Sequence, residues 1–249
     1  MHHNHLIEIG SRTAKSGFSN EDDIVDKFNS FQSDPEASIW LHQMGHPFKL
    51  VRHVRAKKIS RFKADVLVHV ERTDSRVVTE GISIKLLTGK SGFNQIDKRW
   101  VDRYKDLWAI PEDVVDLLKR YVGEIVPTGK VRDLRRQSLD EMSSEERSRI
   151  ISFFESNREL VLRDILEGTG ENKADWMLVT QRNDDETKWR LVPMARVVEF
   201  FGSGPIETTK LGVLRIGKVT MQRKGGDGGR ESAKMLQFKI NPAQLFDLE

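Results

Sequence analysis

The segment "EGISIKLL" (residues 80–87) places a lysine inside an apolar run that is typical of a buried β-strand. Side chains alternate between the two faces of a strand, so Ile82 and Ile84 share one face while Ser83 and Lys85 share the other. Burying an ammonium group without a partner is costly. We therefore expect an anion beside Lys85, either a carboxylate of this chain or a phosphate group.

The preceding segment predicts the neighbouring strand. In "ADVLVHVE" (residues 64–71) polar and apolar side chains alternate strictly, and Asp65 faces away from the valines. The polar "ERTDSR" reads as a turn, so the two segments form an antiparallel hairpin in which Asp65 can meet Ser83 and Lys85. From spacing alone, two interpretations stay open: a structural Asp–Lys ion pair on a half-exposed hairpin, or a functional site.

The composition excludes several classes of protein. The 249 residues include no cysteine, which rules out disulfides, thiolate nucleophiles and cysteine-bound zinc. No apolar run approaches the ~18 residues of a membrane helix, so we expect a cytoplasmic protein that does not enter membranes.

Basic residues are concentrated in three segments, although Lys plus Arg total only 41 against 38 for Asp plus Glu. These segments are "VRHVRAKKISRFK" (51–63), "KVRDLRRQ" (130–137) and "QRKGGDGGR" (222–230). Each is either a solvated face or part of a surface that binds a polyanion.

Periodicity and turn residues indicate one α/β domain with a central mixed sheet flanked by helices. We expect a second hairpin within 175–192 and two closing strands, 214–224 and 233–242, around a glycine-rich loop. Helices are predicted over 21–31, 94–108, 111–122, 143–167 and 194–202.

The order of these parts resembles the PD-(D/E)xK nuclease core. A helix bearing Glu21 is followed by a strand with Asp65, a strand with a polar residue two before Lys85, and a helix. The resemblance implies that the aspartate and the residue two before the lysine hold Mg²⁺, while the lysine touches the scissile phosphate and the attacking water. Hard cations and a lysine can stabilise the charge that phosphodiester cleavage concentrates on phosphate oxygens.

Longer segments carry a more specific resemblance over nearly the whole chain. They are "GFSNEDDI", "GFNQIDKRW", "NRELVLRDILEG", "DWMLVTQR" and "QRKGGDGGRESAKMLQFKINPAQLFDLE". The chain resembles the HinP-type type II restriction endonucleases, which cut GCGC and are structurally related to MspI. This likeness implies a Mg²⁺-dependent DNA phosphodiesterase, with Mn²⁺ as a substitute ion, that cuts both strands of the palindrome after its first G.

The same resemblance implies an organisation and partners. We expect a single restriction-endonuclease domain over 1–249, with a catalytic core at about 15–125 and a helical and C-terminal DNA-recognition part at about 126–249. The expected partners are double-stranded DNA and, functionally, the cognate DNA methyltransferase of the same restriction system. Whether the protein acts as a monomer or a homodimer is left open.

The resemblance assigns the active-site residues one at a time. Asp65 falls on the family's metal-binding aspartate and Lys85 on its catalytic lysine. Where the family has glutamine in "QxK", this chain has Ser83, whose hydroxyl would bind Mg²⁺ together with the backbone carbonyl of Ile84. Glu21 matches the acid of the family's first helix and either lies near the metal or is a helix N-terminal charge.

Two alternatives stay open: a weak or inactive relative that binds a DNA sequence, which Ser83 suggests, and a PD-(D/E)xK nicking or repair nuclease of another specificity, which the long C-terminal match disfavours.

The resemblance also implies DNA contacts. Phe93 aligns with a wedge that enters the duplex from the minor groove; the alternative is a ring that folds back on the core. The glycine-rich segment carries donors and an acceptor for G and C edges in the major groove; the alternative is a flexible, solvated hairpin tip. If this segment reads bases, the runs 51–63 and 130–137 are expected to hold phosphates. The candidate DNA-binding residues are Phe93, Gln95, Lys98, Gln222, Arg223, Lys224, Asp227, Arg230 and Lys234.

Overall fold

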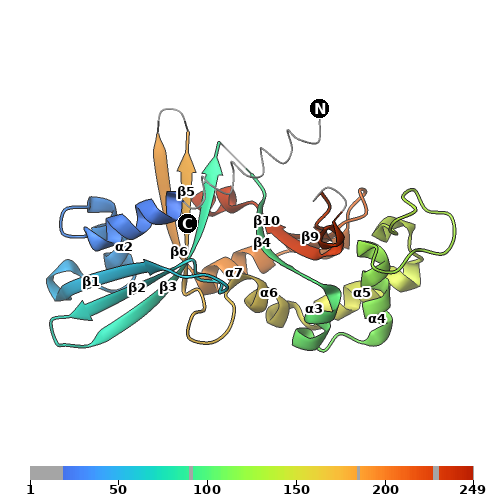
Figure 1. Ribbon diagram of the computed structural model, residues 1–249, viewed down its shortest axis with the longest axis horizontal. Helices are drawn as coiled ribbons and strands as arrows, with labels where there is room; N and C mark the ends of the chain where they lie inside the picture. The colour runs from blue at the N-terminus through green and yellow to red at the C-terminus, as the bar shows by residue number, and fades with distance from the viewer. Residues whose placement is uncertain (1–18, 90–91, 184–185, 227–229, 249) are drawn as a thin grey trace. The chain divides into compact units, whose positions relative to one another are not determined.

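The computed structural model describes residues 19–89, 92–183, 186–226 and 230–248, and these pack into two compact units (Figure 1). The single domain expected over 1–249 stays a prediction, and its expected division near residue 125 does not coincide with the boundaries of the units. Unit 1 comprises the described residues of Met1–Gly92, Leu166–Val197 and Asn241–Glu249, and unit 2 comprises the described residues of Phe93–Ile165 and Val198–Ile240.

Unit 1 contains a five-stranded mixed sheet, sheet A, with the strand order β1-β2-β3-β5-β6. The β3–β5 pair is parallel and the other neighbours are antiparallel, which confirms both predicted hairpins and the central mixed sheet. The strands are β1 (Val51–Lys58), β2 (Val66–Arg72), β3 (Val77–Thr88), β5 (Trp176–Arg182) and β6 (Thr187–Pro193).

Helices cover one face of sheet A and build the apolar core of unit 1. Ile24 and Phe28 project from a helix whose described part covers 19–29 and which ends two residues before its predicted end, and Trp40 projects from α2 (Pro35–Gln43). They pack against buried strand residues such as Val66 and Ile82. The remaining elements of this unit are α2 (Pro35–Gln43) and the short 3₁₀ helices η1 (Phe48–Leu50) and η5 (Pro242–Asp247).

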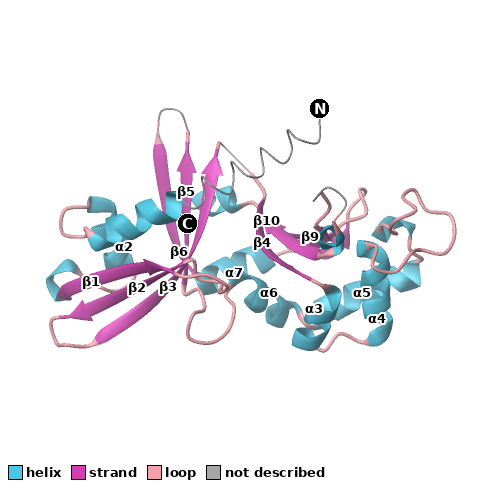
Figure 2. Ribbon diagram, viewed as in Figure 1, coloured by secondary structure: helices cyan, strands magenta, loops and turns pink. Residues whose placement is uncertain are grey.

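Unit 2 is built on a five-stranded antiparallel sheet, sheet B, with the order β4-β10-β9-β8-β7. The rings of Tyr104 and Trp108 lie 5.4 and 5.8 Å from the ring of Phe238, so α3 packs on this sheet (Figure 2). The strands are β4 (Asn94–Arg99), β7 (Ile206–Thr208), β8 (Leu214–Ile216), β9 (Val219–Arg223) and β10 (Leu236–Ile240).

Unit 2 also contains the helices α3 (Val101–Trp108), α4 (Glu112–Val122) and α5 (Ser144–Ser156) and the 3₁₀ helices η2 (Leu139–Glu141) and η4 (Glu231–Lys234). Helices α6 (Arg158–Leu166) and α7 (Met194–Gly202) contain residues of both units.

Two predicted helices need correction. The helix expected over 94–108 is wrong over its first six residues, which form β4 and pair with β10, a strand far along the chain. Helical spacing of Ile96, Trp100 and Tyr104 could not reveal that pairing. The helix expected over 143–167 is split at Asn157, whose side-chain amide donates to the Phe153 carbonyl at 2.9 Å.

Candidate active site

The candidate site forms where the β2–β3 ladder ends. The Asp65 N–H donates to the Ile82 carbonyl at 2.8 Å, whereas the Asp65 carbonyl accepts from the Ile59 N–H at 3.0 Å. The backbone therefore leaves the ladder at Asp65. On the edge of β3 that faces β2, the N–H of Ile84 then donates to Asp65 Oδ2 at 2.6 Å. A carboxylate takes the position that a strand carbonyl would otherwise occupy.

Lys85 is held among three oxygen atoms of this site. Its Nζ lies 2.9 Å from Ser83 Oγ, 2.9 Å from the Ile84 carbonyl oxygen and 3.6 Å from Asp65 Oδ2. The lysine side chain is only 14% exposed, so this arrangement satisfies an ammonium group that is largely out of water. The anion expected beside Lys85 is thus a carboxylate of the chain.

Glu21 brings a second carboxylate to the site from the helix over 19–29. Its Oε2 lies 3.4 Å from Lys58 Nζ, which also contacts Asp22 at 3.0 Å. Burial raises the pKa of Glu21 and the charge of Asp65 raises it further, while Lys58 acts in the opposite direction. The site therefore brings the carboxylates of Glu21 and Asp65 and the ammonium groups of Lys58 and Lys85 close enough to influence one another.

The donor set fits a hard divalent cation. Mg²⁺ is usually bound through one or two carboxylates and completes its coordination with waters and substrate phosphates. The site offers the carboxylates of Asp65 and Glu21, the Ser83 hydroxyl and the Ile84 carbonyl. Within the described ranges, no three His, Cys, Asp or Glu side chains gather as a metal centre, so any ion here would depend on this mixed set.

A glycine fixes β3 beside the site. The Gly81 N–H donates to Asp175 Oδ2 at 2.8 Å, and the Gly81 carbonyl accepts from the Asp175 N–H at 2.7 Å. A Cβ at this position would lie 2.0 Å from the Lys173 carbonyl oxygen. The neighbouring Glu80 binds His46 Nε2 at 2.8 Å and Trp176 Nε1 at 2.9 Å, so it is engaged outside the site.

The described DNA-binding candidates all belong to unit 2, and Asp227 lies outside the described residues. Phe93 is 64% exposed and therefore does not fold back on the core. Gln95 and Lys98 are exposed on β4, and Arg230 is exposed at the far end of the glycine-rich segment. Lys234 Nζ pairs with Glu231 at 2.9 Å.

The strand register separates two of these candidates. Gln222 and Arg223 are consecutive residues of β9 and so point to opposite faces of sheet B. Gln222 lies opposite Gln237, which in turn lies opposite Lys98, so these three side chains share one face. Arg223 lies opposite Leu236 on the other face. The strands continue into the loop, because the Lys224 N–H donates to the Met235 carbonyl at 2.8 Å.

Comparison with known proteins identifies the family. The family model of the R.HinP1I restriction endonuclease matches residues 44–246. The chain belongs to the R.HinP1I restriction endonuclease family. This confirms the resemblance drawn from the sequence.

A solved structure agrees with the fold of this R.HinP1I family member. The crystal structure of the restriction endonuclease MspI in complex with its cognate DNA matches with a TM-score of 0.67, covering 94% of this chain and 92% of that one. At 15% sequence identity the likeness confirms the mixed α/β fold alone. No curated protein sequence matches the chain. In the part of the chain that the structure describes, no helix has the length and apolar character needed to cross a membrane.

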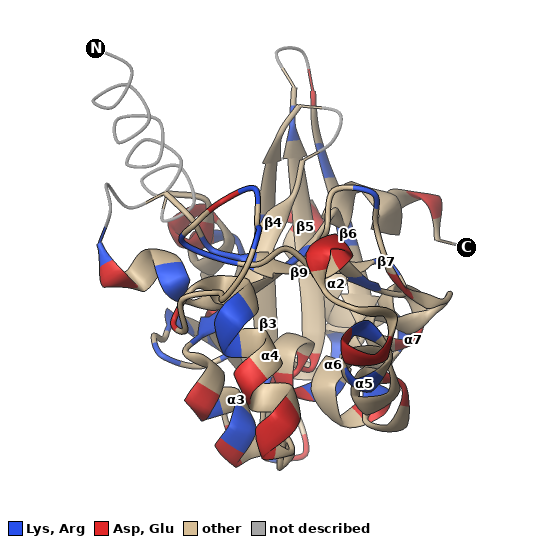
Figure 3. Cartoon of the chain, turned by 90° about the vertical axis from the view of Figure 1, so that its right-hand side faces the viewer, with Lys and Arg blue, Asp and Glu red and all other residues tan. Residues whose placement is uncertain are grey.

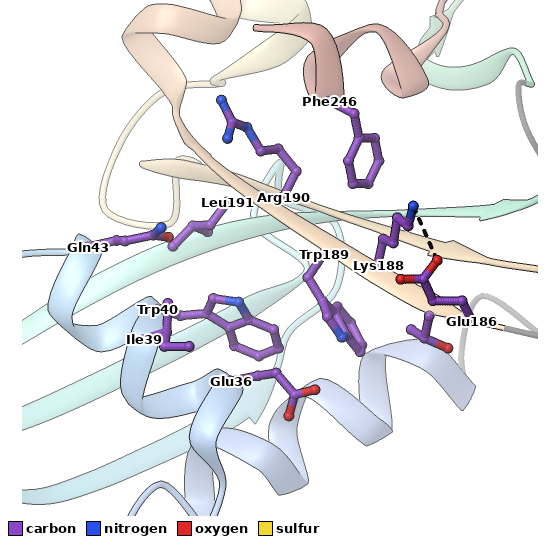
Figure 4. A pocket seen from close by; sticks show the side chains of 11 residues that line it. Glu36, Ile39, Trp40, Gln43, Glu186, Lys188, Trp189, Arg190, Leu191 and Phe246 are labelled. Atoms are coloured by element: carbon purple, nitrogen blue, oxygen red, sulfur yellow. Dashed lines mark ion pairs between the residues drawn. The ribbon is translucent and has the colours of Figure 1, made fainter. Parts of the chain in front are cut away.

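A separate pocket of about 410 Å³ lies in unit 1 of this R.HinP1I family member, between α2, β6 and η5 (Figure 4). Trp40 and Trp189 form its floor with ring centroids 5.1 Å apart, and Glu186 pairs with Lys188 at 3.1 Å on its wall. None of the four candidate active-site side chains lines it. The pocket is therefore distinct from the oxygen-rich site at the end of the β2–β3 ladder.

Proposed function

We propose that the protein is a type II restriction endonuclease that hydrolyses duplex DNA at GCGC, after the first G, with Mg²⁺ or its substitute Mn²⁺. The observation that carries this proposal is the convergence of Asp65, Ser83 and Lys85 on one strand edge in a member of a restriction endonuclease family.

The proposed metal ligands are Asp65, Glu21, Ser83 and the Ile84 carbonyl. A bound Mg²⁺ would lower the pKa of a water nucleophile and neutralise charge on the phosphate. The Ile84 N–H holds Asp65 Oδ2, so the orientation of the carboxylate is set before DNA arrives. Such preorganisation is what a charged transition state requires.

Lys85 is proposed to contact the scissile phosphate. Its ammonium group has three donors, and its neighbours Ser83 and Ile84 hold it at the strand edge beside Asp65. Contact with phosphate oxygens would stabilise the negative charge that grows there during cleavage.

DNA recognition is proposed to lie in unit 2. The exposed ring of Phe93 supports its role as a minor-groove wedge, with Gln95 at the base edges. The segment from Gln222 to Lys234, including Asp227, is proposed to read the major groove. We infer that the protein is a cytoplasmic enzyme that acts as a monomer or a homodimer. A cognate methyltransferase is proposed to protect the DNA of the host.

The test is a digest of DNA of known sequence by the purified protein with Mg²⁺, followed by mapping of the ends. Cuts after the first G of every GCGC, lost on chelation, are expected. Cuts at another sequence would overturn the specificity. Specific binding without cutting would instead support an inactive DNA-binding relative.

A further inference from the structure

Two arginines of unit 2 share one carboxylate. Arg135 donates to Asp133 from Nε to Oδ1 at 2.9 Å and from Nη2 to Oδ2 at 3.1 Å, and Arg136 Nε lies 3.5 Å from the same Oδ2. The hydrogen bond from Arg135, helped by the charge of Arg136, lowers the pKa of Asp133 to about 2. The carboxylate is thus ionised and shared, and it cannot neutralise a third guanidinium.

Arg223 is that third guanidinium. Its Nε is buried and has no hydrogen-bond partner among the described residues. Burial lowers the pKa of Arg223, and the charges of Arg136 and Arg135 lower it further. Arg223 lies on the face of sheet B opposite to that of its neighbour Gln222, and the charges of Arg135 and Arg136 in the segment 130–137 reach it there.

The backbone around this arginine cluster (Arg135, Arg136 and Arg223) is held firmly. A Cβ on Gly123 would lie 2.3 Å from the Arg135 carbonyl oxygen, and the Gln137 N–H donates to the Arg120 carbonyl at 3.0 Å. The segment 130–137 is therefore packed on the end of α4. The Tyr121 hydroxyl donates to the Met221 carbonyl at 3.4 Å, which ties α4 to β9.

Three guanidinium groups and one carboxylate leave an excess of two positive charges in a partly buried setting. Arginine suits phosphate because its planar fork donates two parallel hydrogen bonds to phosphate oxygens. Helices α3, α4 and α5 each carry both acidic and basic residues in nearly equal number (Figure 3). The arginine cluster differs from them because its charge is left unbalanced.

We propose that Arg136 and Arg223 together bind one phosphate of the DNA backbone, with the exposed Arg135 at the rim. This rests on the proposed function, because it takes duplex DNA as the ligand. It assigns Arg223 to positioning the duplex and leaves base reading on β9 to Gln222. The same chemistry could hold a free phosphate ion, which the test separates.

The test compares Arg223→Met and Arg136→Met with Gln222→Ala. Affinities are measured for a GCGC duplex and for a duplex without that site, over a range of salt concentrations and without divalent metal. Each arginine variant should weaken both complexes by the same factor, about tenfold, and reduce the slope of log K against log salt by about 0.9. Gln222→Ala should weaken only the GCGC complex. Arg149→Met, which removes an exposed arginine of α5 that pairs with Asp113 at 3.2 Å, is the control for a lost charge and should change neither.

Two results would overturn the proposal. A loss confined to the GCGC duplex with an unchanged salt slope would make Arg223 a base reader, and no loss on either duplex would make its guanidinium structural. Melting temperatures serve as the folding control, and they should not fall, because replacing one of three crowded cations relieves repulsion.

The last measurement of the test uses inorganic phosphate. If it stabilises the wild-type protein but not Arg223→Met, while DNA binding is unaffected by the substitution, the site belongs to the free anion and the DNA assignment is wrong. Failure of the wild-type protein to bind GCGC would be a failure of the proposed function itself.

Discussion

The two units hold their functional charges in opposite ways. In unit 1 the side chain of Lys85 is 14% exposed, and its ammonium group is bound by neighbouring oxygens. In unit 2 the candidate contacts include an exposed ring, an exposed amide and an arginine whose Nε has no hydrogen-bond partner among the described residues. Chemistry at phosphorus needs groups of fixed geometry, whereas recognition needs donors that are still available to DNA. Substitutions at the site in unit 1 should therefore impair cleavage, whereas substitutions at the candidate contacts in unit 2 should impair recognition of DNA.

The largest effect is expected in unit 1. Lys85→Ala and Asp65→Ala should each slow cleavage of a GCGC duplex by at least about 10²–10³-fold. Specific binding, measured by gel shift, should persist because the base contacts lie in unit 2. Lys85→Arg should also fail, since a planar fork cannot replace a compact charge at a crowded site. Lys188→Ala, which removes an exposed lysine of β6 that pairs with Glu186 at 3.1 Å, is the control, and full activity in either alanine variant would contradict the assignment of the site.

Ser83→Gln separates a metal ligand from a packing residue within unit 1. Ser83 is 4% exposed, so the larger amide should overpack the strand and lower stability by about 1–3 kcal/mol. If the amide nonetheless binds the ion, cleavage at limiting Mg²⁺ should be retained or raised. Thermal melting beside a Mg²⁺ titration measures both, and an unchanged melting temperature would show that the site has room for the glutamine.

Phe93→Ala tests recognition without touching the buried site. The ring is 64% exposed, so the free energy of unfolding should stay within about 0.5 kcal/mol of the wild-type value. DNA bending, followed by fluorescence energy transfer between duplex ends, should be reduced more than the preference for GCGC. Unchanged bending would remove the wedge role, and Leu160→Ala, another exposed apolar side chain, serves as the control.

The smallest effect concerns Glu21. Its pKa is raised in the folded protein by burial and by Asp65, so the folded chain binds this proton more tightly than the unfolded chain. Folding stability should then fall as pH rises from the ordinary value of 4.5 through the raised value. Glu21→Gln removes this cost and should raise the metal-free melting temperature at neutral pH by about 2–4 °C.

Near pH 4 the two proteins should melt alike, and Mg²⁺ should stabilise the variant less than the wild type. A variant that melts lower at neutral pH would show that the carboxylate is compensated without metal.

Local sequence patterns were sufficient for the hairpins β2–β3 and β5–β6, whereas the single strand expected over 214–224 is wrong, because these residues form the hairpin β8–β9. The hairpin carrying Asp65 and Lys85 follows from strict alternation and a polar turn, and its geometry is present in the structure. Strand β4 was missed because Asp97 and its neighbours pair with a strand far along the chain. Strand β1 was missed too, although buried Val54 and Ala56 alternating with exposed cations could have revealed it.

The role of the backbone in the site could not be predicted from the pattern of side chains. The N–H of Ile84 that orients Asp65 becomes available only because the chain turns away before β2 begins. The arginine cluster likewise combines residues 130–137 with the end of β9, two segments that tertiary packing alone brings together.

Gly81 has a consequence for how this protein would look in a genetic screen. Any side chain there would collide with the Lys173 carbonyl and displace the strand that carries Ser83 and Lys85. Random variants at this position should therefore be scored as loss of restriction as often as variants of a charged active-site residue. A geneticist mapping such alleles would place an essential position at a residue that offers neither charge nor hydrogen-bonding side chain to DNA.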